Sequence, residues 1–414
     1  MPVRDLTAAD FVSYRTMASG AFGGGADPTS ADAPQDFSPG QIPLGIDAST
    51  VSGGPRGVIA AGARIRHDQV ALGGGVARSG GVAGLAVHPA YRGEGLFGTL
   101  LTAVIARCRS EGMELSMLYP SNPSIYRRYG YQVVARGRSL IVPLVDLQRI
   151  PAAPGRRLVP VTAETMPRLH RLHHQLTAGD NLMLRREPPL FPEALPAHPW
   201  SALLLEDGAG TAHGYVSWTR RADAADDVGL EVHELFGRTR SDREALLRSL
   251  GSWSTVTELV RLRLRTEDPV LDVLPGGGGR PDPSPEPLVM MRVIDTAATL
   301  RARRAPAALD GTLRLVVEDG TVPEGTCRAG GTYLVSAHHG TITAAEEDVH
   351  AGAGSAEVLG TCRLDIHAAS LLLVGGRTLA DARRLGLRAD ADLAAESFLD
   401  ALLAGPRPSV LDAF

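Results

Sequence analysis

GLAVHPAYRGEGLFGTLLTAVIARCRSEGMELSMLYPSNPSIYRRYGY, residues 84–131, is the stretch that decides the fold of this chain. The apolar run Leu85 to Val87 predicts a buried strand, which ends at His88 and Pro89. The turn Arg92-Gly93-Glu94-Gly95 follows and opens a helix expected from about Leu96 to Cys108. Glycines let the backbone approach an anion closely, and the free N–H groups of a helix start bind it. The pattern therefore predicts a diphosphate-binding loop.

The composition of the 414 residues is that of a globular protein, with 44% hydrophobic and 21% charged residues. No apolar run approaches the roughly 20 residues that span a bilayer. The start, MPVRDLTAADF, has no apolar signal core, so we expect a cytoplasmic protein. A net charge of −4 argues against general nucleic-acid binding, which needs clustered positive charge.

Lysine is absent from the sequence, so every side-chain cation other than histidine is an arginine. This excludes Schiff-base chemistry and a P-loop, because both need a lysine. Cys108, Cys327 and Cys362 are scattered and odd in number, which indicates reduced thiols rather than a disulfide framework or a metal site.

Three domains are expected from the order of strand, helix and linker signals. Residues 1–147 form a mixed α/β domain that contains the predicted loop. Residues 158–274 repeat its strand, turn, helix and strand order, but the turn Gly237-Arg238-Thr239-Arg240 lacks the second glycine. We expect this copy to be structural or pocket-forming. A Gly/Pro-rich linker precedes an α+β domain, residues 288–414, which ends in the apolar, proline-containing tail GPRPSVLDAF.

Two motifs carry a resemblance to a known family. Arg92-Gly93-Glu94-Gly95-Leu96-Phe97 resembles the acetyl-CoA pyrophosphate loop of the GNAT superfamily, Gln/Arg-x-x-Gly-x-Gly/Ala, and departs from it at Phe97, which Gly98 follows. Tyr119-Pro120-Ser121-Asn122 with Ile125 to Tyr131 is similar to the signature of the enhanced intracellular survival (Eis) family of N-acetyltransferases. The resemblance extends over the whole chain.

The resemblance implies tandem GNAT domains, the first active and the second degenerate, followed by a sterol-carrier-like (SCP2-like) domain. It also implies a homo-hexamer that binds acetyl-CoA as cosubstrate. The backbone of the 85–87 strand would bind the pantetheine arm, and the loop would bind the diphosphate. The residues expected at acetyl-CoA are Leu85, Ala86, Val87, Gly93, Glu94, Gly95, Leu96, Phe97, Gly98, Ser121 and Asn122.

The resemblance assigns the two proton transfers to Tyr126 and to the terminal carboxylate of Phe414. A tyrosine O–H, with a pKa near 10, is suited to protonate a thiolate leaving group whose pKa is about 8.5. Tyr119, Tyr129 and Tyr131 compete for this role. A free α-carboxylate has a pKa of roughly 3.5 and needs burial or a relaying water to act as the base. An inert chain end is the alternative.

Other residues give weaker signals. His170, His173 and His174 have metal-ligand spacing on one helix, but Arg171 stands where a zinc hydrolase has glutamate, so we expect no metal. Acidic and aromatic residues near the N-terminus are candidates for an amine pocket, and solvent-exposed residues are an equal alternative; they are Phe22, Asp27, Asp32, Asp36 and Phe37.

The predicted function is acetyl-CoA-dependent N-acetylation of primary amines of polycationic small molecules, by direct attack in a ternary complex. Aminoglycosides, with a consequent role in antibiotic resistance, or polyamines are the expected acceptors. Acetylation of lysine side chains in peptides is the alternative within this class. A lipid or sterol carrier with a vestigial CoA site is the alternative from another class. Nucleic acid and membrane insertion are not expected.

Overall fold

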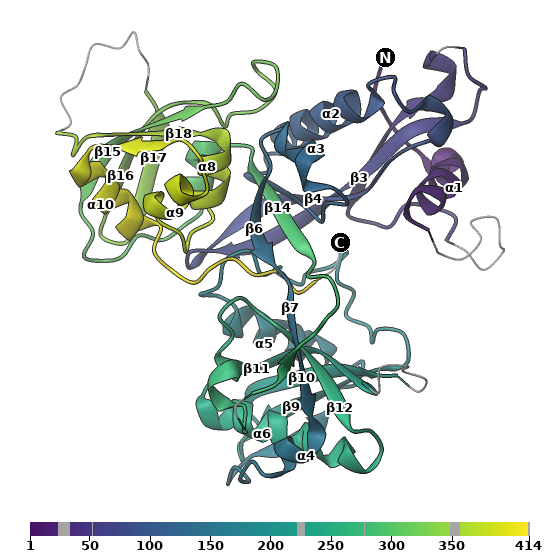
Figure 1. The fold of residues 1–414 in the computed structure, drawn as a ribbon, viewed down its shortest axis with the longest axis vertical. Coiled ribbons are helices and arrows are strands. Elements are labelled where there is room, and N and C mark those ends of the chain that lie inside the picture. Colours follow the sequence, from purple (N-terminus) through teal and green to yellow (C-terminus); the bar gives the residue numbers. More distant parts are fainter. Residues whose placement is uncertain (24–33, 52, 222–227, 277, 348–356, 413–414) are drawn as a thin grey trace. The chain divides into compact units, whose positions relative to one another are not determined.

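The computed structural model describes residues 1–23, 34–51, 53–221, 228–276, 278–347 and 357–412 (Figure 1). Contacts divide the chain into two compact units. The first unit contains Met1–Val134 and Val289–Gly405, and the second contains Ala135–Leu288 and the described residues from Pro406 onward. In the described part of the chain, no helix is long and apolar enough to cross a membrane.

The N-terminal part of the first unit is built on a seven-stranded sheet. Its strands, in spatial order, are β1 (Arg4–Asp5), β2 (Gln41–Asp47), β3 (Ile59–Leu72), β4 (Gly75–Val87), β5 (Leu115–Leu118), β14 (Leu288–Val293) and β6 (Gln132–Arg136). The first four strands are antiparallel, and β4 and β5 are parallel because helix α2 (Leu96–Ser110) connects them.

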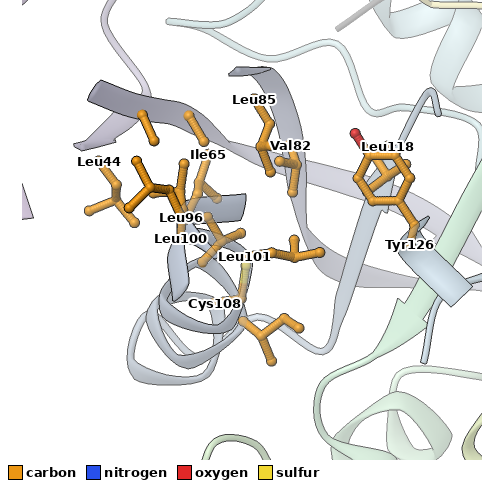
Figure 2. Packing of buried hydrophobic residues seen from close by; sticks show 14 of the residues in the cluster. Leu44, Ile65, Val82, Leu85, Leu96, Leu100, Leu101, Cys108, Leu118 and Tyr126 are labelled. Atoms are coloured by element: carbon orange, nitrogen blue, oxygen red, sulfur yellow. The ribbon is translucent and has the colours of Figure 1, made fainter. Parts of the chain in front are cut away.

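Two helices cover opposite faces of this sheet (Figure 1). The face that carries Ala61, Ala63 and Ile65 packs against α2, whose apolar side includes Leu100 and Leu101 (Figure 2). The opposite face packs against α1 (Phe11–Phe22), where Tyr14 lies so close to Gly62 that a Cβ there would be 2.7 Å from the tyrosine ring. This glycine is therefore a packing requirement of the first helix.

A strand from far along the chain completes this sheet. β14 pairs antiparallel with β5 and also borders β6, although residue 288 was expected to open the third domain. Conversely, β7 (Arg138–Pro143) belongs to the sheet of the second unit, although residues up to 147 were expected in the first domain. The sequence boundaries differ from the structure because linkers mark where the chain leaves an element, whereas strand pairing decides which sheet a segment joins.

The C-terminal part of the first unit has a five-stranded sheet with helices packed on it. The sheet order is β17 (Thr341–Glu346), β16 (Gly331–His338), β15 (Gly311–Glu318), β18 (Thr361–Asp365) and β19 (Ala389–Ala391). The helices are α7 (Thr296–Arg301), α8 (Ile366–Leu372), α9 (Leu379–Arg384) and α10 (Leu393–Leu402). The expected α+β character of this region is confirmed.

The second unit is also built on a seven-stranded sheet. Its order is β13 (Arg280–Pro281), β7, β12 (Leu259–Leu264), β11 (Leu230–Gly237), β10 (Ala212–Arg220), β9 (Trp200–Glu206) and β8 (Arg157–Pro160). Its helices are α4 (Leu144–Gln148), α5 (Met166–Leu176) and α6 (Arg240–Gly251). The parallel pair β11 and β12 with α6 between them repeats β4, α2 and β5, so the predicted internal repeat is confirmed.

Candidate active site

The site begins where two parallel strands of the first unit stop pairing. β4 and β5 pair from Ser79 opposite Leu115 to Val82 opposite Leu118. Beyond this last pair the strands diverge, so the backbone of β4 on this side no longer has β5 as its hydrogen-bonding partner. A peptide-like ligand arm can pair with such a strand edge.

A β-bulge lies in β4 directly after the divergence. The pairing with β3 runs from Ala83 opposite Arg64 to Ala86 opposite Gly62, which leaves two residues of β4 opposite one of β3. Gly84, one of these two, has a φ of +57°, and its carbonyl accepts a hydrogen bond of 2.9 Å from the Tyr14 hydroxyl. A Cβ on Gly84 would lie 2.2 Å from that hydroxyl, so the bulge requires glycine.

A pocket of about 350 Å³ occupies the space between the diverging strands. Figure 2 shows Val82 and Leu85 of β4 on one side of this region and Leu118 with Tyr126 on the other. The lining residues are Phe22, Arg64, Val82, Ala83, Gly84, Leu85, Leu118, Tyr119, Ser121 and Tyr126. Of the residues predicted to touch acetyl-CoA, the pocket brings together Leu85 and Ser121 with the proposed acid.

The glycine turn lies between β4 and α2. Gly93 and Gly95 have φ values of +93° and +74°, and no atom lies within 4 Å of a Cβ built on either residue. Gly95 is the N-cap of α2, a helix of 15 residues whose first turn carries no acidic side chain. The open space above both glycines, the free N–H groups of the first helical turn and the helix dipole together fit a diphosphate.

The side chain of Phe97 packs against the core and two tyrosine rings. The Phe97 ring lies 5.5 Å from that of Tyr126 and 6.1 Å from that of Tyr129. Gly98 faces Tyr129, whose hydroxyl would be 2.3 Å from a Cβ at this position. The departure from the family motif is therefore accommodated by an aromatic cluster under the helix start.

Tyr126 lies in the short helix α3 (Pro123–Arg127) and is only 6% exposed. Burial raises the pKa of its hydroxyl above the ordinary value, while hydrogen bonding to Ser121 opposes that rise. Asn122 caps α3, because its side-chain oxygen accepts hydrogen bonds from the backbone N–H and the hydroxyl of Ser124. The side-chain oxygen of Asn122 is thus engaged in the helix cap.

Of the other three tyrosines of the motif, two pack in the core and one lines the pocket. The Tyr131 hydroxyl is fully buried and lies 2.8 Å from the Ser116 hydroxyl, and burial raises its pKa strongly. Tyr129 packs on Phe97 and Gly98. Tyr119 lines the pocket with Tyr126. The geometry therefore leaves Tyr126 and Tyr119 as the tyrosines at the pocket wall.

Sequence reasoning missed two residues of this site, Tyr14 and Arg64. Tyr14 fixes the Gly84 carbonyl, and Arg64 lines the pocket with its guanidinium 5.9 Å from the Tyr14 ring centre. Neither lies in a recognisable motif, because both reach the pocket from elements outside residues 84–131. The one signal in the sequence was a polar residue, Arg64, in the otherwise apolar first half of β3. Its place at the pocket follows only when the register of β3 against β4 is known.

The residues predicted for an amine pocket have different outcomes. Phe22 is 58% exposed and lines the pocket. Phe37 packs instead against Phe11 and Tyr14, with ring centres 5.0 and 5.5 Å apart. The Asp36 side chain accepts a hydrogen bond from the Phe37 N–H. Asp27, Asp32 and Phe414 lie outside the described residues.

Comparisons with known proteins agree with this architecture. Residues 2–134 match one acetyltransferase (GNAT) domain model and residues 182–293 match another. Solved structures with a similar fold include a GCN5-related N-acetyltransferase from Kribbella flavida, with 24% identity and a TM-score of 0.78 over 100% of this chain and 98% of the other. No functionally curated protein matches the sequence significantly.

Two further solved structures share the fold over the full length of both chains. A probable N-acyltransferase from Enterococcus faecalis V583 has 18% identity and a TM-score of 0.82, with coverage of 100% of this chain and 99% of the other. Eis1 from Mycobacterium abscessus has 17% identity and a TM-score of 0.71, with 100% coverage of both. GNAT acetyltransferases take their acetyl group from acetyl-CoA. Residues 2–134 and 182–293 therefore belong to the GNAT acetyltransferase family, and the chain is a tandem GNAT N-acetyltransferase.

Proposed function

We propose that the first unit acetylates primary amines of polycationic small molecules, aminoglycosides or polyamines. The observation that carries this proposal is the pocket at the divergence of β4 and β5, which has Tyr126 in its wall and a glycine turn with a helix start beside its strand. This arrangement provides for a diphosphate, an extended ligand arm and a proton donor in one domain.

The chain's own groups have separate roles in this proposal. The backbone around Gly93, Gly95 and Leu96 binds the diphosphate, and the free edge of β4 from Gly84 to Val87 pairs with the pantetheine arm. Acetyl-CoA supplies the activated acetyl group as a thioester. Tyr126 donates its proton to the sulfur that leaves. A phenol is protonated at neutral pH, and burial raises the pKa of this one further.

The proposed base is the carboxylate of Phe414, as the resemblance to the Eis family implies. It would accept a proton from the attacking amine, directly or through water. A chain extended by a few residues beyond Phe414 tests this role. We expect a fall in kcat with unchanged affinity for acetyl-CoA, and full activity of the extended chain would contradict the assignment.

The acceptor class is tested by measuring release of the CoA thiol with different amines. Kanamycin-like amines and spermidine are compared with lysine-containing peptides at equal amine concentration. Faster turnover of the small polycations supports the proposal, whereas faster turnover of the peptides favours the protein-acetylating alternative. Uptake of an apolar ligand without thiol release from any amine favours the lipid-carrier alternative.

We expect Gly95→Val to weaken acetyl-CoA binding by at least about tenfold. Gly95 has a φ of +74°, which a β-branched residue does not adopt without distorting the turn. Isothermal titration with acetyl-CoA measures the effect. Gly155→Val is the matched control, because Gly155 has a φ of +71° with no atom within 4 Å of a built Cβ and lies in the other unit. Equal affinity of both variants would contradict the role of the turn.

We expect one molecule of acetyl-CoA per chain, although the chain has two GNAT domains. In the second unit the Asp242 carboxylate caps the start of α6, where it accepts hydrogen bonds from the N–H and the hydroxyl of Thr239. Hydrogen bonds from Thr239 and Arg156 lower the pKa of Asp242 despite burial, so an ionised carboxylate already occupies the helix start where a diphosphate would bind. A titration stoichiometry near two would contradict this prediction.

A further inference from the structure

The second unit has a pocket at the place that corresponds to the candidate active site. β11 and β12 pair in parallel from Leu230 opposite Val260 to Val232 opposite Leu262, and then diverge. A register shift against β10 lies directly after Val232, as the bulge in β4 lies after Val82. A pocket of about 570 Å³ opens at this divergence, and its wall includes His233, Glu234 and Arg263 from the two strands.

The C-terminal tail of the chain forms part of this pocket. Leu411 and Asp412 line it, and Leu411 is buried in the same apolar cluster as Tyr215 and Phe236. The backbone of the tail is fixed along its length. The Asn181 side chain donates to the Pro406 carbonyl, the Ser409 N–H donates to the Asn181 carbonyl, and Arg263 donates to the Leu411 carbonyl, at 2.7, 2.9 and 2.6 Å.

Thr266, which follows β12, adds two further contacts to the tail. Its N–H donates to the Ser409 hydroxyl at 2.8 Å, and its own hydroxyl donates to the Pro408 carbonyl at 2.9 Å. The tail therefore satisfies backbone groups at the end of a strand whose parallel partner has diverged. It has the hydrogen bonding of a bound peptide rather than that of a frayed chain end.

The last described residue of the tail, Asp412, belongs to a buried cluster of charged side chains. Arg186 donates to the carboxylates of Glu234 and Asp412, at 2.9 and 2.8 Å, and the three side chains are 11%, 6% and 11% exposed. The Tyr215 hydroxyl also donates to Glu234, at 3.1 Å. Charge-assisted contacts inside a protein are strong and directional, so the Asp412 side chain has one preferred position.

We infer that the second GNAT domain uses the place where β11 and β12 diverge to bind the chain's own segment Pro406–Asp412 in place of a cofactor. Glu234 stands two residues after the last parallel pair, where the first domain has Gly84, so a carboxylate occupies the place at which a ligand arm would approach. Arg186, Glu234 and Asp412 are then positioning residues for the end of the chain.

The functional consequence rests on the proposed function, in which the Phe414 carboxylate is the base. Two residues follow Asp412 in the sequence and can span at most about 7 Å, so a docked Asp412 would limit the reach of the terminal carboxylate. An undocked tail would sample many orientations. Its terminal carboxylate would then be close to the amine for a smaller fraction of the time, and the reaction would be slower.

Asp412→Ala and Leu411→Ala, each in the full chain, test the docking. Asp412→Ala removes one carboxylate but leaves Glu234 to neutralise Arg186, so the second unit stays folded. The amides of Ser409 and Thr266 both form hydrogen bonds that join the tail to the rest of the unit, and their hydrogen exchange is expected to become about tenfold faster in both variants. Asp272→Ala, a change at an exposed carboxylate of the same unit, is the control and leaves exchange unchanged. Unchanged exchange in both tail variants overturns the inference.

Steady-state kinetics separate the docking from its consequence. In Asp412→Ala we expect kcat to fall about tenfold while the affinity for acetyl-CoA stays the same, because the cofactor site lies in the first unit. If exchange accelerates but kcat is unchanged, the positioning role is overturned and the docking stands. If the wild-type protein acetylates no amine, the proposed function fails, and the exchange measurement still decides whether the tail is bound.

Discussion

Tyr126→Phe is expected to lower kcat for acetyl transfer about 100-fold, with the dissociation constant for acetyl-CoA unchanged within about twofold. The substitution removes only the hydroxyl. The ring remains packed against Phe97 and Tyr131, with centres 5.5 and 6.2 Å away, so the pocket keeps its shape. Single-turnover measurement of CoA thiol release and isothermal titration with acetyl-CoA separate the chemical step from binding.

Tyr131→Phe is the matched control for this prediction. Its hydroxyl contacts Ser116 in the core rather than the pocket, so its loss costs about 1 kcal/mol of stability and little activity. Tyr119→Phe tests the competing tyrosine at the pocket wall. A larger loss of kcat in Tyr119→Phe than in Tyr126→Phe would transfer the acid role to Tyr119.

The pH dependence of the wild-type enzyme provides a second measurement of the same role. An acid catalyst must be protonated, and burial raises the pKa of Tyr126 above its ordinary value of 10.0. The rate is therefore expected to rise with pH as the amine substrate loses its proton, without a fall caused by Tyr126 below about pH 10. A fall in the rate above neutral pH that is absent in Tyr126→Phe would contradict a raised pKa of Tyr126.

The local part of the site could be predicted from the sequence because its signals are close together. Strand, glycine turn and helix follow one another within residues 84–110, and each is encoded by periodicity, positive-φ glycines or a helix start. The repeat was recognisable for the same reason, since β11, α6 and β12 have the same order. The turn before α6 lacks the second glycine, and Thr239 is the N-cap there, where α2 has Gly95.

Contacts between distant segments could not be predicted in this way. Tyr14 reaches Gly84 across 70 residues, and β14 joins a sheet whose neighbouring strand β5 ends 170 residues earlier, at Leu118. Neither has a local pattern, since strand pairing depends on tertiary packing. The tail was recognised as apolar and proline-stiffened, but its partners, Asn181, Thr266 and Arg186, come from three separate places in the second unit.

Arg292 on β14 connects the two parts of the first unit beneath the tyrosine motif. It is fully buried, and it donates to the Tyr129 carbonyl, to Asp319 and to the Thr321 hydroxyl. Gly130 is tightly packed against it, because a Cβ there would lie 1.9 Å from the guanidinium. This arginine therefore supports the turn that follows α3, on which Tyr126 lies.

Arg292→Met is expected to lower the free energy of unfolding of the first unit by about 3–5 kcal/mol, because it leaves the buried Asp319 carboxylate without its cation. Urea unfolding followed by circular dichroism measures the change. Combining the substitution with Asp319→Asn is expected to restore part of the loss, since the neutral amide costs less to bury than an unpaired charge. Arg388→Met is the control, because the ion pair of Arg388 with Glu318 is exposed and contributes at most about 1 kcal/mol.

Equal stability of the Arg292 and Arg388 variants would show that β14 joins the sheet without depending on its arginine. A loss of stability that Asp319→Asn partly reverses would show that the tyrosine motif depends on an ion pair formed by residues more than 150 positions away in the chain.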